Sequence, residues 1–170
     1  SRCVNGSDIL IVRHQGSGPA GTPDMTMINC AGLGESDAVT NATRPISVFH
    51  VQVNNAGEPT LRCSYRDWAA GTWVTRDLIE GVETFQVLYG TDQVTPNTAP
   101  LPAASAPTDS VNDRYLRADE IVVPGNDVAT RDNWRRVRSL RVGMVLRGAA
   151  GAAIDRGTTA VTSRYPLGQA

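Results

Sequence analysis

Few residues in this chain of 170 have the types and spacing that catalysis requires. A hydrolase pairs a nucleophile with a base, which is usually histidine, and neither His14 nor His50 lies in a recognisable motif. Glu80 and Glu83 are spaced as an acid–base pair on a helix would be, but Gly81 interrupts such a helix. We predict that the protein is not an enzyme and uses no cofactor and no small-molecule substrate.

The three cysteines are the next candidates for chemistry. Cys3, Cys30 and Cys63 show no Cys-x-x-Cys spacing, which argues against a zinc ribbon or a thioredoxin-like site. Cys30 and Cys63 could bind zinc together with His50 only if both are free thiols. The three cysteines fit a disulfide formed in an oxidising compartment or buried thiols of a cytosolic protein, and composition leaves both open.

A cluster of arginines is the strongest charge feature. All 16 cationic side chains are arginine, and the net charge of −1 gives no overall attraction to nucleic acid or to an anionic membrane. Only Asp132 opposes the cluster locally, so it could form a positive patch that contacts DNA phosphates, or it could pair with nearby carboxylates. Its members are Arg131, Arg135, Arg136, Arg138 and Arg141.

Patterns with a period of two predict the strands that position these side chains. The clearest is a hairpin with strands over 46–53 and 60–65 and a turn-rich connection over 54–59. The most regular alternation runs over 140–147, where we expect a central or near-central antiparallel strand. Ile9–Val12 is a continuous apolar run, which is typical of a strand covered on both faces.

Other segments give weaker signals. Met25–Cys30 is expected to be a second strand. Trp68 and Trp73 flank a loop or tight hairpin, where they could form a binding surface or, as we expect, close the end of a small core. Further on, we expect one helical turn at 118–120 and a later short turn capped by Asp132.

Length and composition indicate one domain over residues 1–170 of the α+β class, mostly β, built from antiparallel sheet with short helical turns. A chain of this length buries roughly 70% of its unfolded surface, enough for a core. No apolar run of about 18 residues is present. Residues 91–110 are rich in Pro, Ala, Ser and Thr, so we expect a variable loop within the domain.

The stretch from Leu78 to Gly90 organises the rest. Asp77 and Glu80 have capping-box spacing, which predicts one helical turn that Gly81 ends. The period then changes to two, and Gly90 closes the strand. We expect a short turn that leads into a half-buried strand.

This stretch, extended to Asp92 (LIEGVETFQVLYGTD), resembles the segment that marks the PilW family of type IV pilus minor pilins. Three further pieces resemble the same family in the same order, at 6–13, 112–118 and 134–147. The motif residues are Leu78, Glu80, Gly81, Val82, Phe85, Tyr89 and Gly90.

The resemblance implies a pilin-like head without catalysis. A long hydrophobic helix would precede residue 1 and act as membrane anchor and as the spine of the filament. The head would join other minor pilins (PilX-, PilV- and FimT/FimU-like) and the major pilin at the inner membrane, facing the periplasm. This complex primes assembly and ends at the tip of the extracellular pilus, whose uses include adhesion, twitching motility and DNA uptake.

The resemblance also favours a disulfide between Cys30 and Cys63, which would leave Cys3 free or paired with a cysteine upstream. In this family the position of the 91–110 loop often carries an aspartate-rich stretch that suggests calcium. Here the acidic residues are too scattered for an EF-hand loop, so we predict no metal. These residues are Asp92, Asp109 and Asp113.

Two alternatives stay open. The arginine cluster could make the head a DNA receptor during uptake. The minor pseudopilin J of type II secretion shares the layout of a turn followed by a strand and would have the same fold. The chain also lacks the arginine-rich closing strand that ends in Leu-Arg-Asn in this family, so its C-terminal sheet edge is not predicted.

Overall fold

The computed structural model describes residues 4–37, 40–102, 108–148 and 167. Its fold is mostly β, with two antiparallel sheets and a few short helices, which confirms the predicted class. None of the helices in the described residues is long and apolar enough to cross a membrane. The described chain divides into two compact units: residues up to Phe85 together with residues 144–148, and residues 86–143 together with Leu167. One domain over 1–170 stays a prediction.

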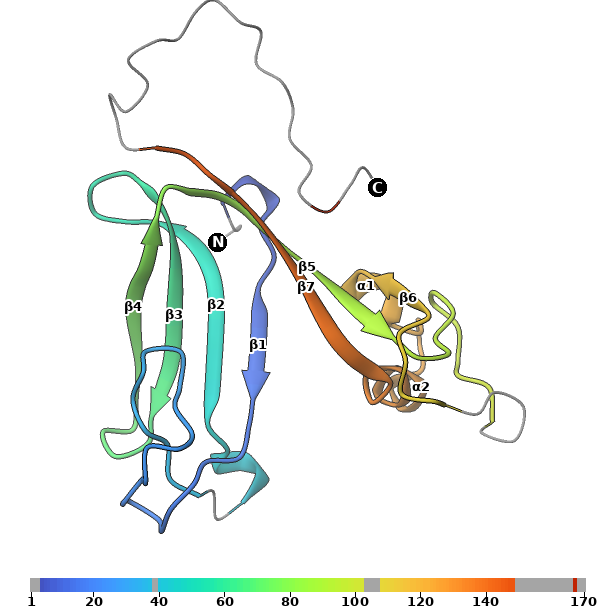
Figure 1. Cartoon of the computed structure of the whole chain (residues 1–170), viewed down its shortest axis with the longest axis horizontal. Coiled ribbons are helices and arrows are strands. Elements are labelled where there is room, and N and C mark those ends of the chain that lie inside the picture. The colour runs from blue at the N-terminus through green and yellow to red at the C-terminus, as the bar shows by residue number, and fades with distance from the viewer. Residues whose placement is uncertain (1–3, 38–39, 103–107, 149–166, 168–170) are drawn as a thin grey trace, which may run out of the picture. The chain divides into compact units, whose positions relative to one another are not determined.

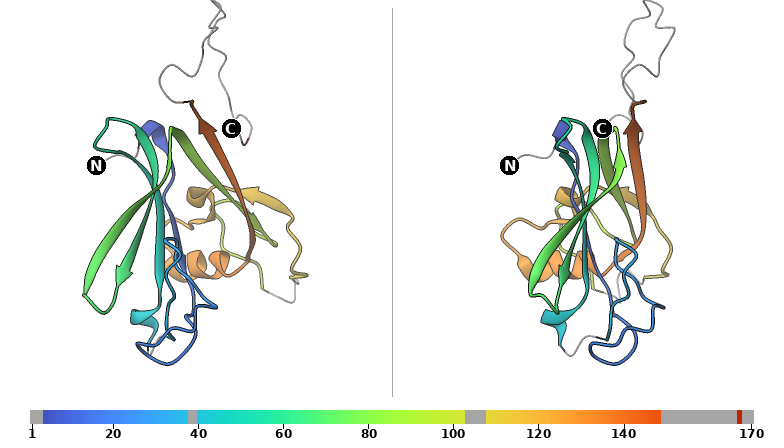
Figure 2. Two further views of the ribbon diagram at one scale, coloured as in Figure 1. Left: turned by 60° about the vertical axis from the view of Figure 1, so that its left-hand side comes forward. Right: turned by 90° about the vertical axis from the view of Figure 1, so that its left-hand side faces the viewer.

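The first unit contains a four-stranded sheet in the order β1-β2-β3-β4, and each strand pairs antiparallel with its neighbour (Figure 1). The turned views show that this sheet is twisted (Figure 2), as the sterics of L-residues dictate. Two short 3₁₀ turns, Val4–Gly6 and Asn41–Thr43, precede β1 and β2. The strands are β1 (Leu10–Arg13), β2 (Ile46–Val53), β3 (Pro59–Asp67) and β4 (Thr72–Glu80).

The β2–β3 hairpin confirms the clearest sequence prediction. The side-chain oxygen Oδ1 of Asn54 accepts hydrogen bonds from the backbone N–H groups of Ala56 (2.9 Å) and Glu58 (3.0 Å). Gly57 follows with φ +83°, which a residue without Cβ adopts without strain. Turn chemistry of this kind depends on neighbouring residues, so the sequence suffices to predict it.

The core of the first unit lies on one face of this sheet. Val51 and Leu61 lie opposite each other on β2 and β3 and are almost fully buried, as are Cys63 and Tyr65. A disulfide joins Cys63 to Cys30, with the two Cα atoms 5.9 Å apart, and it is the pair that the resemblance favoured. The disulfide fixes the long connection between β1 and β2 to the buried face.

The second unit combines a three-stranded sheet, in the order β6-β5-β7, with two helices. The backbone N–H of Arg147 donates to Gly81 O, and that of Asp92 donates to Arg136 O, so β5 and β7 run antiparallel. Both strands also extend into the first unit. The elements are β5 (Val82–Thr91), β6 (Arg114–Leu116), α1 (Ala118–Ile121), α2 (Asp127–Trp134) and β7 (Val137–Leu146).

A small apolar cluster forms the core of the second unit. Val94, Leu116 and Ile121 are buried there, from the loop after β5, from β6 and from α1. Tyr89 and Trp134 pack against this cluster and meet edge to face, with ring centroids 4.8 Å apart. β5 confirms the strand predicted after Gly81, and Tyr89 on this strand is partly buried against the cluster.

The predicted helical turn over 77–80 is wrong, because β4 continues to Glu80. The Asp77 carboxylate pairs with Arg62 on β3 (2.6 Å), and Glu80 accepts from Asn54 Nδ2 (3.0 Å). Neither side chain is then available to cap a helix. Pairing along β3 outweighs the local capping signal, and Gly81 makes a strand-to-strand turn.

The predicted strand over Met25–Cys30 is also wrong. Among the described residues this segment makes only an isolated bridge between Ile28 and Gly34. Asn29 Oδ1 accepts from the backbone N–H groups of Ala31 (2.9 Å) and Leu33 (3.2 Å), which turns the chain back. The short-range bonds of one asparagine override the alternating pattern.

The sequence placed one strand, β7, too centrally and predicted that another, β1, is covered on both faces. Within the described residues β7 is at the edge of its sheet, and its alternating apolar side chains, such as Leu140 and Leu146, are exposed. Residues 10–13 do form a strand, but Ile9 and Ile11 are more than half exposed, so one face is not covered by described residues. An apolar run does not show which of its faces is covered.

The C-terminal half confirms one local prediction and corrects another. The helical turn expected at 118–120 is α1, and Gly125 follows it with φ +71°. However, α2 is capped by Asn126, whose Oδ1 accepts from Ala129 N (3.0 Å), and Asp132 lies near its other end. The sequence beyond Gly148 departs from the closing strand of the resembling family. Apart from Leu167, this segment lies outside the described residues.

Candidate functional site

The motif segment runs from the end of β4 through β5 to Asp92. Two structural features explain why its first glycine is a glycine. Gly81 has φ +77°, and an added Cβ would lie 2.6 Å from the backbone O of Arg147. Its N–H donates to Pro59 O (2.8 Å), and its O accepts from Arg147 N (2.9 Å). Any side chain here would be strained and would separate β7 from the turn.

Arg147 joins the turns around this glycine. Its guanidinium forms ion pairs with Glu58, in the β2–β3 turn, and with Glu83 on β5, where Nε and Oε1 are 3.0 Å apart. Glu83 also accepts from Asn5 Nδ2 (3.0 Å). Glu80 and Glu83, whose spacing resembles that of an acid–base pair, therefore have separate structural partners.

The start of β5 is bonded to the segment before β1. Phe85 N donates to Ser7 Oγ (3.1 Å), and Phe85 O accepts from Asp8 N (2.8 Å). Phe85 is buried and Val82 is fully buried. Val82 and Phe85 thus contribute to the packing of the first unit, whereas Leu78, at the end of β4, is exposed.

The second motif glycine makes room for a polar cluster. An added Cβ on Gly90 would lie 2.3 Å from Ser139 Oγ and 2.8 Å from Asn112. Asn112 Nδ2 donates to Ser139 Oγ (2.6 Å), which contacts the Tyr115 hydroxyl at 3.4 Å. The Arg141 guanidinium stacks over the Tyr115 ring, 4.0 Å from its centroid. The Ser139 hydrogen bond lowers the pKa of Tyr115, and Arg141 acts in the same direction.

Asp92, at the end of the motif, fixes the base of the variable loop. The residue is fully buried, and its Oδ2 accepts from Ser110 N (2.8 Å) and lies 3.4 Å from Arg138 Nε. Asp113 Oδ2 accepts from Gln93 N (2.6 Å). The two carboxylates thus bond to backbone at both ends of the loop. We call these contacts the loop clamp.

The loop clamp brings together aspartates that the sequence shows as scattered. Asp92 and Asp113 each bond to loop backbone, whereas Asp109 bonds locally to Val111 N (2.9 Å). No group of His, Cys, Asp and Glu side chains among the described residues has the arrangement of a metal site. Instead, backbone N–H groups donate to all three carboxylates, and Arg138 also faces Asp92.

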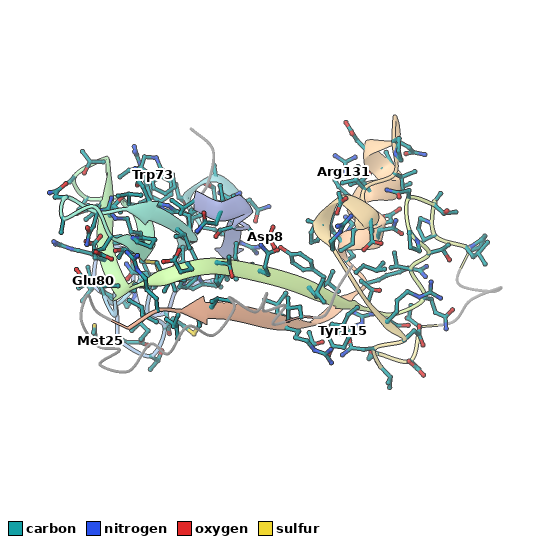
Figure 3. All side chains as sticks on the ribbon, turned by 90° about the horizontal axis from the view of Figure 1, so that it is seen from above. Asp8, Met25, Trp73, Glu80, Tyr115 and Arg131 are labelled. Carbon is teal, nitrogen blue, oxygen red and sulfur yellow. A yellow bond between two sulfur atoms is a disulfide. The ribbon has the colours of Figure 1, made fainter. Side chains whose placement is uncertain are left out.

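The arginine cluster is largely occupied by contacts within the second unit. Arg135 pairs with Asp132 (2.9 Å), Arg138 belongs to the loop clamp, and Arg136 donates to backbone oxygens of the loop. The remaining members are Arg141, which stacks on Tyr115, and Arg131, which is exposed on α2. Figure 3 labels Arg131 and Tyr115, which lie well apart. The cluster therefore offers fewer free charges to phosphates than its spacing suggests.

His50 is hydrogen-bonded across the sheet. Its Nε2 lies 3.1 Å from Ser64 Oγ, which lies 2.8 Å from Thr75 Oγ1. Partial burial, followed by the charge of Arg62, lowers the pKa of His50. The ring therefore favours its neutral form. No carboxylate in the described residues hydrogen-bonds His50 to orient it as a catalytic base.

The two tryptophans differ from expectation. Trp68 and Trp73 lie in and beside the β3–β4 turn and are 43% and 54% exposed, so they do not close a core. Arg66 lies opposite Trp73 on β3, and its guanidinium is 5.6 Å from the centroid of Trp68. The expectation that they are buried was wrong because the hairpin extends beyond the core of its sheet.

Comparison with known proteins agrees with the motif. A family model described as type IV pilus-assembly protein W matches residues 48–167, which is more than half of the chain and includes the whole of β5. No curated protein and no solved structure matches the chain. The chain therefore belongs to the PilW family of type IV pilus-assembly proteins.

Proposed function

We propose that these residues form the head of a minor pilin, a structural subunit that primes assembly of the type IV pilus and lies at or near the filament tip. The match to the pilus-assembly family over residues 48–167 carries this proposal. Involvement in type IV pilus assembly follows from family membership.

The absence of catalysis belongs to the same proposal. The polar groups that might react are used in structure: Glu80 and Glu83 bond to neighbouring turns, and His50 bonds to Ser64. The motif glycines admit a backbone oxygen at Gly81 and a polar side-chain cluster at Gly90. These contacts support a role in shape and docking, which needs defined surfaces and no reactive group.

The loop between β5 and β6 is the surface we assign to partner choice. The loop clamp fixes its two ends through Asp92 and Asp113, while Leu101 and Val111 near its described parts are about 60% exposed. Fixing the two ends of the loop lowers part of the entropic cost of ordering it on binding. Its partners would be other minor pilins and the major pilin.

Anchoring is part of the proposal as well. In the full-length protein we expect a hydrophobic helix to hold the head at the inner membrane, facing the periplasm, before the head enters the pilus. The apolar side chains of Ile9 and Ile11, which described residues leave more than half exposed, are candidates to contact such a helix.

The test is a deletion of the full gene in the native bacterium, followed by complementation. We expect the amount of pilin sheared from the cell surface to fall by most of its wild-type value, and the full-length gene to restore it. Undiminished piliation in the deletion strain would refute the proposal. If type II secretion of exoproteins failed instead, the pseudopilin alternative would be correct.

A further inference from the structure

The outer edge of β4 is open. In the part of the chain that the structure describes, β4 is the last strand of its sheet and pairs only with β3. Proteins usually protect such edges by making them short, by placing charged side chains or Pro on them, or by β-bulges. β4 has 9 residues, against 4 in β1 at the opposite edge, and contains no Pro. Of its three charged residues, Asp77 and Glu80 already have partners on β3 and in the β2–β3 turn. Its edge is thus suited to pairing with another strand.

The regular part of this edge is Thr72–Asp77. Over this segment β4 pairs without interruption with Arg62–Asp67, and the register then shifts, which leaves Leu78 without an opposite residue. The bulge ends regular pairing on the outer side as well. A segment of this length equals a typical strand. It lies wholly within the first unit.

Exposed side chains beside this edge supply anchors. Trp73, labelled in Figure 3, is 54% exposed on β4, and Trp68 is exposed in the adjoining turn, under the guanidinium of Arg66. Tryptophan and arginine dominate the residues that carry binding energy at protein interfaces. An apolar side chain of a partner could pack against Trp73 as its backbone pairs with β4.

One charge on this edge is uncompensated. Arg62 pairs with Asp77, whereas the exposed side chain of Arg76 forms no ion pair or hydrogen bond with any described residue. A partner would therefore gain from an acidic residue beside Arg76. This charge, together with Trp73, defines the chemistry that a strand pairing with β4 would need.

We propose that the β4 edge binds an extended segment of another pilus subunit, with an acidic residue next to Arg76 and an apolar residue next to Trp73. Backbone hydrogen bonds would give affinity, and these two positions would give specificity. The inference rests on the proposed function, because it takes the partner to be a pilus subunit. It assigns a second contact surface, separate from the loop after β5.

The test uses this chain and the purified soluble heads of the other minor pilins and the major pilin of the same bacterium, mixed one at a time. Amide hydrogen exchange is followed by mass spectrometry. We expect one of these heads to slow exchange over 72–77 by about tenfold or more. Arg76→Glu and Trp73→Ala should each weaken that binding by about tenfold. Arg13→Glu, the same charge change at the opposite edge, is the matched control and should leave binding unchanged.

Four results would overturn the inference. Protection by no head, or protection confined to other segments, would show that the edge is not a docking site. Protection without any added head, rising with the concentration of this chain, would assign the edge to a second copy. In cells, full piliation by the Arg76→Glu variant, where the deletion has lost it, would refute this inference while the proposed function stands.

Discussion

The two ends of β5 are fixed by different means. In the first unit, Gly81 admits the backbone of Arg147, and the neighbouring sheet carries a disulfide. In the second unit, Gly90 admits side chains only, and the loop clamp holds the chain through Asp92. Backbone contacts and covalent bonds tolerate little change, whereas side-chain contacts can adjust. Substitutions should therefore be more damaging at the first end than at the second.

Removal of the disulfide should have the largest effect. The Cys30→Ala/Cys63→Ala variant opens a loop with a sequence separation of 33 residues, and the chain-entropy model predicts a loss of about 3–4 kcal/mol in the free energy of unfolding. Hydrogen exchange resolved by segment should show the loss in β2 and β3, with β6 and α2 unchanged. Equal acceleration in both units would contradict the separate accounts of the two ends.

The two motif glycines give the sharpest comparison. Gly81→Ala should cost roughly 2–3 kcal/mol, because alanine is strained at φ +77° and its Cβ would meet a backbone oxygen. Gly90→Ala should cost about 1 kcal/mol, because Ser139 and Asn112 can rotate away. Chemical denaturation of both variants checks the order. A larger loss for Gly90→Ala would refute the distinction between backbone and side-chain contacts.

Asp92→Asn should have a smaller and more local effect. The amide keeps the shape of the side chain but loses the charge that faces Arg138, at a cost of about 1–2 kcal/mol. Exchange should accelerate at Ser110, whose N–H donates to Asp92, while the first unit keeps its protection. Asp109→Asn, whose side chain bonds only locally, is the control and should change little.

The pH dependence of stability should include a small contribution from His50. Its pKa in the folded protein is lowered, so the folded state favours the neutral ring. This contribution is present above the unfolded pKa of about 6.5 and is lost as pH falls through the folded value. Because the ring is only partly buried, the loss should stay below about 1 kcal/mol. His50→Gln should flatten this part of the curve, and an unchanged curve would contradict the assignment.

The smallest effect is expected on the binding of DNA. Since most of the clustered arginines have internal partners, few of them are left to contact phosphates, so Arg131→Ala with Arg135→Ala should lower any weak binding to duplex DNA and its salt dependence only slightly. Binding titrations across salt concentrations measure this. A clear drop in the salt slope would favour the DNA-receptor alternative over a purely structural head.

Most of what the sequence could predict depends on interactions between neighbouring residues, although one such local signal was misread. The hairpin around Asn54 and the strand after Gly81 depend on neighbouring residues, and both were predicted correctly. The helical turn at 77–80 failed because Asp77 pairs with Arg62 on a different strand. The strand at Met25–Cys30 failed because the asparagine within it turns the chain back.

The candidate site shows the same limit. The motif glycines were recognisable, but the reasons for them, Arg147 and Ser139, lie more than 45 residues further along the chain. The loop clamp joins Asp92 to Ser110 across a loop whose composition gives no sign of it. The only local signal was the aspartate that ends the motif. Exposure of Trp73 depends on how far a hairpin extends beyond its core, which periodicity does not contain.

The most direct test of the central claim is quantitative mass spectrometry of pili sheared from the native bacterium and purified. We expect peptides of this chain in the pilus fraction, in an amount far below that of the major pilin, as a subunit at or near the tip requires. Their absence from pure pili, while the protein is abundant in the cell envelope, would contradict its role as a pilus subunit.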